Sequence, residues 1–349
     1  MQQGQELQPR LVAQGLQEVH GLGHRCAHAI TISRCPYLVT GRFAAVVSRR
    51  WRQRCRRKDE PRRGADRCAG GVSGLRIRLL GTAAAEGWPA LFCRCPHCRR
   101  AREAGGRSLR SRASANVDGI FQFDFGPDSQ HHVLGGNDLS AVEHLIFTHS
   151  HTDHLYPGDL AMRVPPYAHG QDRPLSVYGN DRVVARLGAA LGDVTRLGLE
   201  LHQIEPFQAV AVGDATLVPL IADHDRHETC LIHLFGHEGR WLLYGHDTGY
   251  LPETTWAFLG TWAAAGGRLD VAFLDCTNGP GEGMRFHMGL GGGARVRERL
   301  LDLGAARGDT RFVLTHFSHN GGLLHEELVE RAGPLGFEVA YDGMEIQAL

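Results

Sequence analysis

Residues 149–154 read His149-Ser150-His151-Thr152-Asp153-His154, and they follow the apolar run Leu145-Ile146-Phe147-Thr148. The apolar run predicts a buried strand. Imidazole nitrogens and carboxylate oxygens together are ligands that suit Zn, Mn or Fe. Because four such side chains lie within six residues at the end of a rigid strand, the segment predicts a metal-binding active site.

The alternative interpretation is a chance cluster of histidines on a solvated turn, since the chain contains 21 of them. An isolated pair of histidines would carry little weight for that reason. The spacing His-x-His-x-Asp-His directly after an apolar run favours the metal site over the chance cluster.

The chain has 349 residues, of which 42% are hydrophobic and 45 are glycine. This length is enough for one large α/β core with an appendage. The formal net charge of zero hides an asymmetry, because residues 1–74 carry 14 Lys or Arg against 5 Asp or Glu, which leaves 24 against 33 for residues 75–349. We therefore expect a basic N-terminal extension, residues 1–74, and an acidic folded domain, residues 75–349.

The extension is rich in arginine, as in Arg49-Arg50-Trp51-Arg52, and shows little apolar periodicity. Such a composition is poorly suited to burying a core and indicates a disordered or loosely helical segment. Its apolar stretch, residues 37–47, is interrupted by Arg42 and is too short to span a bilayer.

Three interpretations of the extension remain open: a targeting peptide, a nucleic-acid-binding arm, and translated sequence upstream of the true start. Abundant arginine with almost no lysine is typical of GC-rich coding sequence and favours the last. No recognisable secretory signal precedes the core. We expect a cytoplasmic protein, or an organellar one if the extension is a targeting peptide.

The folded domain is expected to begin near Leu75, where apolar and polar residues alternate before Gly81-Thr82. Strands are predicted at residues 75–80, 120–125, 145–148, 175–178, 215–221, 231–234, 241–244, 271–274, 311–315 and 337–341. Helices are predicted at residues 181–191, 253–259, 294–303 and 323–332. Strands that alternate with helices predict a layered α/β domain.

Further candidate metal ligands follow other apolar runs. His224 follows residues 218–221, Asp247 follows 242–244, Asp275 follows 272–274, and His316 follows 312–315. Each of them lies just beyond its run, as His149 does. Ligands placed repeatedly at strand ends can converge on one edge of a sheet.

Taken together, these residues resemble the metallo-β-lactamase superfamily over about residues 75–349. The resemblance implies the α/β fold of that family, an αβ/βα four-layer sandwich that carries two metal ions at one edge of its sheets. It assigns His149, His151 and His224 to one ion, Asp153, His154 and His316 to the other, and Asp247 to a bridging position between them.

Within the superfamily the chain is more similar to the PhnP-like family of phosphoribosyl cyclic phosphate phosphodiesterases. The shared segments are residues 80–82 (Leu-Gly-Thr), 93–98 (Cys-Arg-Cys-Pro-His-Cys), 275–276 (Asp-Cys), 285–287 (Arg-Phe-His), 314–319 (Leu-Thr-His-Phe-Ser-His) and 341–346 (Tyr-Asp-Gly-Met-Glu-Ile). They occur in the same order along the whole domain. The resemblance implies hydrolysis of a small, cyclic phosphate ester by a homodimer.

The three cysteines Cys93, Cys95 and Cys98 have a chemistry of their own. Their Cys-x-Cys-x-x-Cys spacing supplies three soft ligands and leaves a tetrahedral structural zinc site one ligand short. The resemblance offers His319 as the fourth ligand, with His97 as a weaker candidate. A disulfide or three reduced surface thiols are the alternatives, and a disulfide fits poorly with an odd cluster in a chain that lacks a secretory signal.

The expected mechanism follows from two divalent cations, for which Mn and Zn are both suitable. Such a pair lowers the pKa of a water molecule toward neutrality and neutralises charge on a phosphoryl group. By resemblance, Asp247 bridges the cations and His287 protonates the departing alkoxide. The alternative for His287 is an exposed loop histidine among glycines.

Other histidines and cysteines are expected to have no part in the chemistry. His227 is a rival of His224 as a ligand, and the resemblance favours His224. Cys230 and Cys276 fall in or beside apolar strands and are expected to be buried. The histidines interpreted as packing or surface residues are His131, His132, His144, His246 and His325.

Two other classes of function remain as alternatives. One is another hydrolase of the superfamily, a nuclease or a thioesterase, although the acidic balance of residues 75–349 argues against a nucleic-acid partner. The other is a carrier protein similar to the pyrroloquinoline-quinone biosynthesis B family, whose members share the cysteine loop and the Asp-Gly-Met-Glu-Ile ending but have lost most of the histidine motif. We expect a small phosphate ester as substrate and no membrane partner.

Overall fold

The structure, a computed structural model, describes residues 74–348. The predicted N-terminal extension, except for its last residue, therefore lies outside the described residues. In the described part, no helix is both long and apolar enough to cross a bilayer.

Two seven-stranded sheets and a small hairpin make up the strands. The first sheet contains β16 (Glu345–Ala348), β1 (Leu75–Gly81), β2 (Ser114–Val117), β3 (Phe121–Phe123), β4 (His144–Ile146), β5 (Leu175–Gly179) and β6 (Leu199–Gln203), in this order. The second contains β15 (Glu338–Val339), β14 (Arg311–Thr315), β11 (Val271–Asp275), β10 (Arg240–Gly245), β9 (Leu231–His237), β8 (Ala215–Ile221) and β7 (Val210–Val212). The hairpin pairs β12 (Met284–Arg285) with β13 (His287–Met288).

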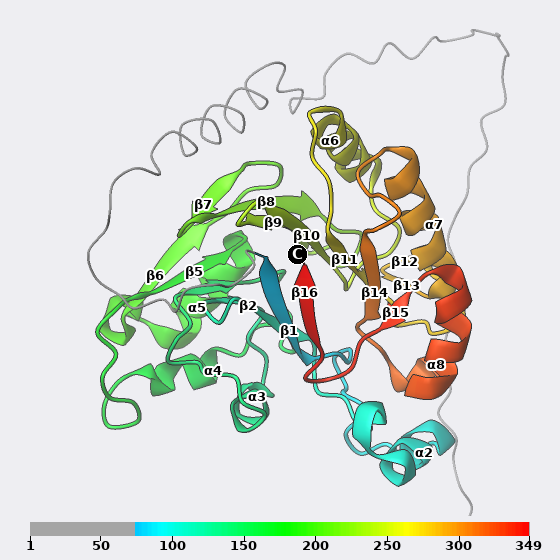
Figure 1. The fold of residues 1–349 in the computed structure, drawn as a ribbon. Helices are drawn as coiled ribbons and strands as arrows, with labels where there is room; N and C mark the ends of the chain where they lie inside the picture. The colour runs from blue at the N-terminus through cyan, green and yellow to red at the C-terminus, as the bar shows by residue number, and fades with distance from the viewer. Residues whose placement is uncertain (1–73, 349) are drawn as a thin grey trace, which may run out of the picture. The chain divides into compact units, whose positions relative to one another are not determined.

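Most helices lie on the outer faces of the two sheets, whereas residues 96–104 form a helix beyond the sheets, in cyan at the bottom of Figure 1. The helices are α2 (Pro96–Ala104), α3 (Ser129–Leu134), α4 (Pro157–Leu160), α5 (Asp181–Leu191), α6 (Glu253–Ala264), α7 (Leu290–Asp302) and α8 (His325–Ala332). Val183 and Leu187 of α5 are fully buried in the core beneath the first sheet. Asn180 caps the start of α5 by accepting a hydrogen bond from the N–H of Val183.

Aromatic side chains fill the space between the two sheets. Phe123 of β3 lies 4.7 Å from Tyr244 of β10 and 5.4 Å from Phe235 of β9, measured between ring centroids, and all three are buried. Such pairs contribute about 1 kcal/mol beyond the burial of their area. The arrangement confirms the four-layer α/β sandwich expected from the sequence.

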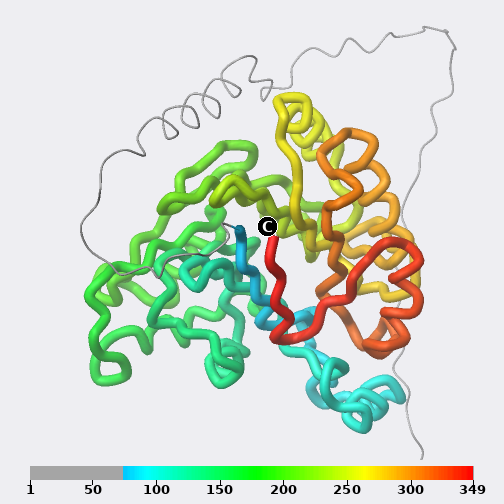
Figure 2. The backbone as a smooth tube through the Cα atoms, in the orientation of Figure 1, coloured from blue at the N-terminus to red at the C-terminus, as the bar shows by residue number. Residues whose placement is uncertain are grey.

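Each sheet combines antiparallel and parallel strands. β3, β4, β5 and β6 are parallel in the first sheet, and β10, β11, β14 and β15 are parallel in the second. The carboxyl ends of parallel strands meet at one edge of a sheet, where α/β proteins commonly bind ligands. The tube in Figure 2, coloured by residue number, shows the path of the chain from one sheet to the other.

The sequence-based elements agree with the structure for the long apolar segments and differ at short ones. α5 coincides with its predicted range, whereas α6 and α7 are longer than expected and β15 has two residues instead of five. β2, β6, β7 and β16 were not predicted as strands, and α2, α3 and α4 were not predicted as helices.

Candidate metal centres

The predicted ligands lie on loops that leave the carboxyl ends of four strands. The segment of residues 149–154 follows β4, His224 follows β8, Asp247 follows β10, and His316 follows β14. These four loops come from both sheets, so the ligands meet where the two sheets adjoin.

Two groups that share one residue contain the seven predicted ligands. His149, His151, His224 and Asp247 form the first group, and Asp153, His154, Asp247 and His316 form the second. In each group the candidate ligand atoms all lie within 4.8 Å of one another. Asp247 is therefore the residue that belongs to both groups. Further candidate groups combine Asp247 and His316 with Asp275 and His287, and His151 with Asp225 and Glu228.

Several atoms of these groups are buried without an ordinary partner. Within residues 74–348, the buried atoms lacking a hydrogen bond include Nε2 of His149, His154 and His316, and Oδ1 of Asp247. Leaving a buried polar atom unpaired costs free energy, and such atoms in a native fold call for a partner. Divalent cations satisfy imidazole nitrogens and carboxylate oxygens together, so the residues present fit two such cations.

The backbone is strained at two residues of the ligand groups. Asp247 has φ 55° and His316 has φ 60°, values that side-chain-bearing residues seldom adopt. Strain of this kind persists where the surrounding structure holds it, commonly at functional sites.

In three of these histidines the other ring nitrogen contacts a residue outside the groups. Nδ1 of His154 lies 2.8 Å from Asp124 Oδ2, and Thr277 Oγ1 lies 2.9 Å from Nδ1 of His316. Thr148 Oγ1 lies 3.0 Å from Nδ1 of His149. Contacts of this type fix the tautomer and the ring orientation of metal-binding histidines.

Sequence analysis overlooked Asp124 as a functional residue. It follows β3 as His149 follows β4, is fully buried, and accepts hydrogen bonds from the N–H and Oγ1–H of Thr148 as well as facing His154. Sequence analysis placed Asp124 inside a strand expected at residues 120–125, whereas β3 ends at Phe123, so the search for side chains beyond strand ends passed over it.

Burial and neighbouring charges set the protonation of the groups. Burial, with His154 nearby, holds the pKa of His149 well below its usual range, which leaves a neutral ring able to bind a cation. Burial also opposes the charge on Asp247, but the histidines around it, His316 first, outweigh this and hold its pKa well below normal. Asp247 is thus a carboxylate in the centre of the site.

His287 lies beside this centre on the hairpin of β12 and β13. Its Nδ1 is 3.3 Å from Oδ2 of Asp275 and 3.3 Å from Oδ1 of Asp247. Burial lowers its pKa, but hydrogen bonding to Asp275 and the charge of both carboxylates outweigh burial and raise the pKa to about 9. Because its side chain remains 29% exposed, a bound molecule can reach His287.

Two arginines and an aromatic ring lie next to His287 at the hairpin. Phe286, at the tip of the hairpin, has φ 63° and is 37% exposed. The guanidinium carbons of Arg226 and Arg285 lie 5.5 and 5.2 Å from its ring centroid. The carbonyl of Phe286 lies 3.3 Å from Nδ1 of His224, which places this cationic edge directly against the metal-ligand groups.

The cysteine motif forms a separate group. Cys93, Cys95, Cys98 and His319 have candidate ligand atoms within 4.8 Å of one another, and Nδ1 of His319 lies 3.4 Å from Sγ of Cys95. A hydrogen bond from the backbone N–H of Cys98 outweighs the effect of slight burial and lowers the pKa of the Cys95 thiol to about 6. Burial raises the pKa of the Cys98 thiol to about 11. His97 is not in the group, and the five cysteines among residues 74–348 are all free thiols.

The remaining histidines lie mostly in packing contacts. His246 is buried between the rings of His154 and His316, at 5.8 and 5.3 Å, and the rival candidate His227 is exposed and belongs to neither group. Cys230 and Cys276 are buried, as predicted.

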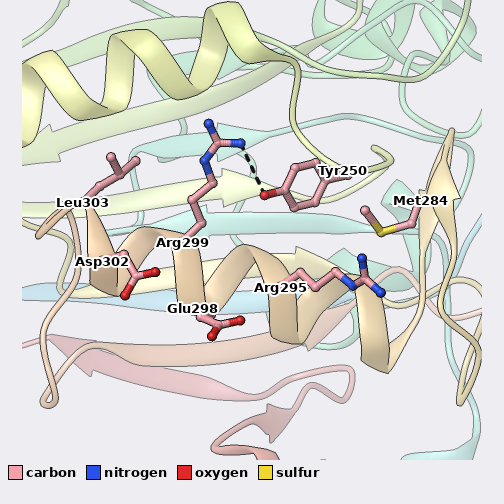
Figure 3. Close-up of a pocket in the computed structure, with 7 residues that line it drawn as sticks. All are labelled: Tyr250, Met284, Arg295, Glu298, Arg299, Asp302 and Leu303. Carbon is pink, nitrogen blue, oxygen red and sulfur yellow. Dashed lines mark hydrogen bonds between the residues drawn. The ribbon is translucent and has the colours of Figure 1, made fainter.

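An open pocket of about 740 Å³ lies away from the ligand groups, along α7 (Figure 3). Its lining includes Tyr250 and Arg299, joined by a hydrogen bond of 3.4 Å, and Met284. Met284 begins the hairpin that carries His287, but none of the candidate ligands lines this pocket.

Comparisons with known proteins agree with this geometry. A family model described as "Beta-lactamase superfamily domain" matches residues 121–317, more than half of the chain. The coenzyme PQQ synthesis protein B of Methylococcus capsulatus is 27% identical over 324 residues, covering 77% of this chain and 99% of that protein. A ribonuclease Z of Staphylococcus haemolyticus is 40% identical over 63 residues, but this match spans 17% of the chain and 20% of the relative.

Among solved structures, a new diphosphatase from the PhnP family superimposes with a TM-score of 0.60 at 23% identity, covering 78% of this chain and 97% of the other. At that identity the likeness concerns the fold. The family model, the two facing sheets and the paired ligand groups converge on one assignment. The chain belongs to the beta-lactamase superfamily and has the metallo-β-lactamase fold.

Proposed function

We propose that the protein is a metal-dependent phosphodiesterase that hydrolyses a small cyclic phosphate ester with a five- or six-membered ring. The observation that carries the proposal is the pair of four-residue groups that share Asp247, with His287 beside them. Two divalent cations, Mn or Zn, would be held by His149, His151 and His224 on one side and Asp153, His154 and His316 on the other. Bound there, they would activate water and neutralise charge on a phosphoryl group.

His287 supplies the proton that the reaction needs. The leaving group of a sugar or alkyl phosphate ester is a poor one, because it departs as a strongly basic alkoxide. Asp275, fully buried and 3.3 Å from His287 Nδ1, keeps the ring protonated and oriented. The proton moves from the ring of His287 to the departing oxygen as the P–O bond breaks.

The cationic edge formed by Arg226, Arg285 and Phe286 supports an anionic substrate. Nε of Arg285 is engaged by Asp223 at 2.9 Å, which fixes the side chain and leaves its terminal nitrogens for a ligand. Guanidinium groups bind phosphate oxygens with two parallel hydrogen bonds, and an aromatic face keeps them extended. A thioester or an uncharged lactone would make no use of these charges.

We expect Arg226→Gln to raise the KM for a phosphate diester about 10-fold and to change kcat little. A hydrogen bond to a charged group contributes about 1.5–3 kcal/mol, and this one would be made equally in the ground and transition states. Steady-state kinetics on a cyclic phosphate measures both constants. Arg196→Gln is the matched control, since Arg196 is 84% exposed and pairs with Asp193 on its own turn; equal KM values in the two variants would exclude the cationic edge from substrate binding.

The cysteine group is proposed to hold one structural zinc through Cys93, Cys95, Cys98 and His319. His319 lies three residues beyond His316, and Ser318 between them donates a hydrogen bond to Glu86 in the loop that leads to the cysteines. A zinc ion there would fix the segment that positions His316 as a ligand of the catalytic pair.

Replacement of Cys95 by serine is expected to release about one zinc per chain and to lower the melting temperature by several degrees. Binding of a structural zinc is coupled directly to folding. Atomic absorption and thermal unfolding measure the two quantities. Cys230→Ser provides a comparison with a buried thiol outside the group, and a Cys95 variant that keeps its full zinc content would rule out the proposed site.

A carrier function is the second candidate, because the match to the coenzyme PQQ synthesis protein B covers 99% of that relative. The complete set of predicted ligands in both groups, with His287 3.3 Å from Asp247, favours hydrolysis over carriage. The deciding experiment is a panel of five- and six-membered cyclic phosphates and bis(p-nitrophenyl) phosphate, tested with full-length protein before and after metal removal. Metal-dependent cleavage supports the phosphodiesterase, and tight binding of a quinone-like cofactor without turnover supports the carrier.

A further inference from the structure

The two ring nitrogens of His151 face different partners. Its Nδ1 lies 3.2 Å from Nε2 of His224, so the two nitrogens point toward the same position in the first ligand group. Its Nε2, on the opposite side of the ring, lies 3.0 Å from Oδ2 of Asp225. If Nε2 carries the proton and donates it to Asp225, the lone pair of Nδ1 is free for a cation.

Asp225 is itself held in place. Its Oδ1 accepts a hydrogen bond of 2.9 Å from the backbone N–H of His227. This bond fixes the orientation of the carboxylate, so that Oδ2 faces the ring of His151.

The loop that carries Asp225 is also tied to the histidine motif. The carboxylate of Glu228 accepts hydrogen bonds from N–H and Oγ–H of Ser150, at 3.1 and 2.9 Å. It also accepts one of 3.1 Å from Asn180, the residue that caps α5. These hydrogen bonds hold the loop of Asp225 against the segment of His151 and so fix the two side chains relative to each other.

His151 differs from the other ligand histidines in the exposure of this outer contact. The carboxylate behind His154, that of Asp124, is fully buried with its partner. The side chains of His151 and Asp225 are 37% and 25% exposed. Loss of Asp225 would therefore expose the far side of the His151 ring to water and free it to rotate, and would leave the buried contacts of the second group unchanged.

We propose that Asp225 is a positioning residue that fixes the tautomer and orientation of His151 and thereby sets the affinity of the first ligand group for its cation. The inference rests on the proposed function, because it presupposes that both groups bind divalent ions. The carboxylates of Asp225 and Glu228 also form a candidate ligand group with His151, but in this proposal Asp225 acts through His151 and is not itself a ligand. Its effect is selective for one of the two catalytic ions, since Asp124 and Thr277 serve His154 and His316 in the other group.

Metal titration of the full-length protein tests the proposal. Wild type, Asp225→Ala, Asp225→Asn and the control Asp309→Asn are stripped of metal, returned one zinc for the cysteine group, and titrated with Mn²⁺ or Co²⁺. Calorimetry and Mn²⁺ electron paramagnetic resonance give the number of bound ions and their dissociation constants, and Co²⁺ absorption reports on ligand geometry. Asp309 suits the control because its side chain is 74% exposed and pairs with Arg307 at the surface.

For Asp225→Ala we expect one dissociation constant to rise about 10- to 100-fold, with the second ion and the zinc unaffected. Asp225→Asn should fall between this variant and wild type, because an amide oxygen still accepts a hydrogen bond from Nε2. The Co²⁺ spectrum of the weakened site should change, whereas Asp309→Asn should match wild type in every measurement.

Unchanged constants in Asp225→Ala would overturn the positioning role while leaving two ions and the proposed function in place. Complete loss of one ion at saturating metal, with Asp225→Asn no better than Asp225→Ala, would also overturn it, because Asp225 would then be a ligand. A wild-type protein that binds neither catalytic ion would instead refute the proposed function itself.

Discussion

Replacement of Asp247 by asparagine is expected to lower kcat/KM for bis(p-nitrophenyl) phosphate at least about 1,000-fold. Asp247 belongs to both ligand groups, and its carboxylate lies 3.3 Å from His149 Nε2 and 2.9 Å from His154 Nε2. Without its charge, neither group retains its shared ligand, and the loss of about 4 kcal/mol of transition-state stabilisation corresponds to three powers of ten.

The control for this variant is its zinc content. The cysteine group shares no residue with the two catalytic groups, so Asp247→Asn should keep one zinc per chain and an ordered fold by circular dichroism. A folded variant with wild-type turnover would remove Asp247 from the chemistry and with it the shared-ligand arrangement.

Replacement of His287 by alanine is expected to lower turnover of a cyclic alkyl phosphate about 100- to 10,000-fold, the range typical of a lost general acid. The same change should affect bis(p-nitrophenyl) phosphate much less, because p-nitrophenolate is a stable anion that leaves without a proton. Metal content should remain unchanged, since His287 faces the carboxylates of Asp247 and Asp275 from outside the two proposed metal groups.

His227→Ala is the comparison for His287, as an exposed histidine on a neighbouring loop that belongs to neither ligand group. Its turnover should match wild type on both substrates. Equal losses on alkyl and aryl esters in His287→Ala would contradict proton donation and assign the residue to another role.

The sequence predicted those parts of the fold that rest on long apolar segments. β8, β10, β11 and β14 are buried strands with apolar runs; a candidate ligand follows β8, β10 and β14, and Asp275 ends β11. One rule, a polar residue directly beyond a buried strand, located His224, Asp247 and His316. The rule works because a buried strand is rigid and therefore holds the residues at its end in a fixed position.

Short or half-exposed strands escaped prediction for a physical reason. β7 has three residues with one buried, and β6 has one fully buried residue out of five. β2, with the sequence Ser-Ala-Asn-Val, is fully buried but half polar. Their pairing is decided by neighbouring strands, which local sequence does not describe.

Contacts distant in sequence also lay beyond prediction. Asp225 acquires its role from His151, 74 residues earlier, and the cationic edge arises when Arg226 meets the hairpin tip 60 residues later. Both are polar loop residues with no periodic pattern, so their contacts become evident only in the folded structure.

The central claim is that two divalent ions, held on either side of Asp247, make this protein a phosphodiesterase. Its most direct test is stepwise return of Mn²⁺ or Zn²⁺ to metal-stripped, full-length protein, with bound ions per chain and cleavage of bis(p-nitrophenyl) phosphate measured at every step. The account predicts that cleavage rises with the two ions bound beyond the structural zinc and that His149→Ala abolishes it. A protein with its full metal complement that cleaves neither this ester nor any cyclic phosphate would contradict the account.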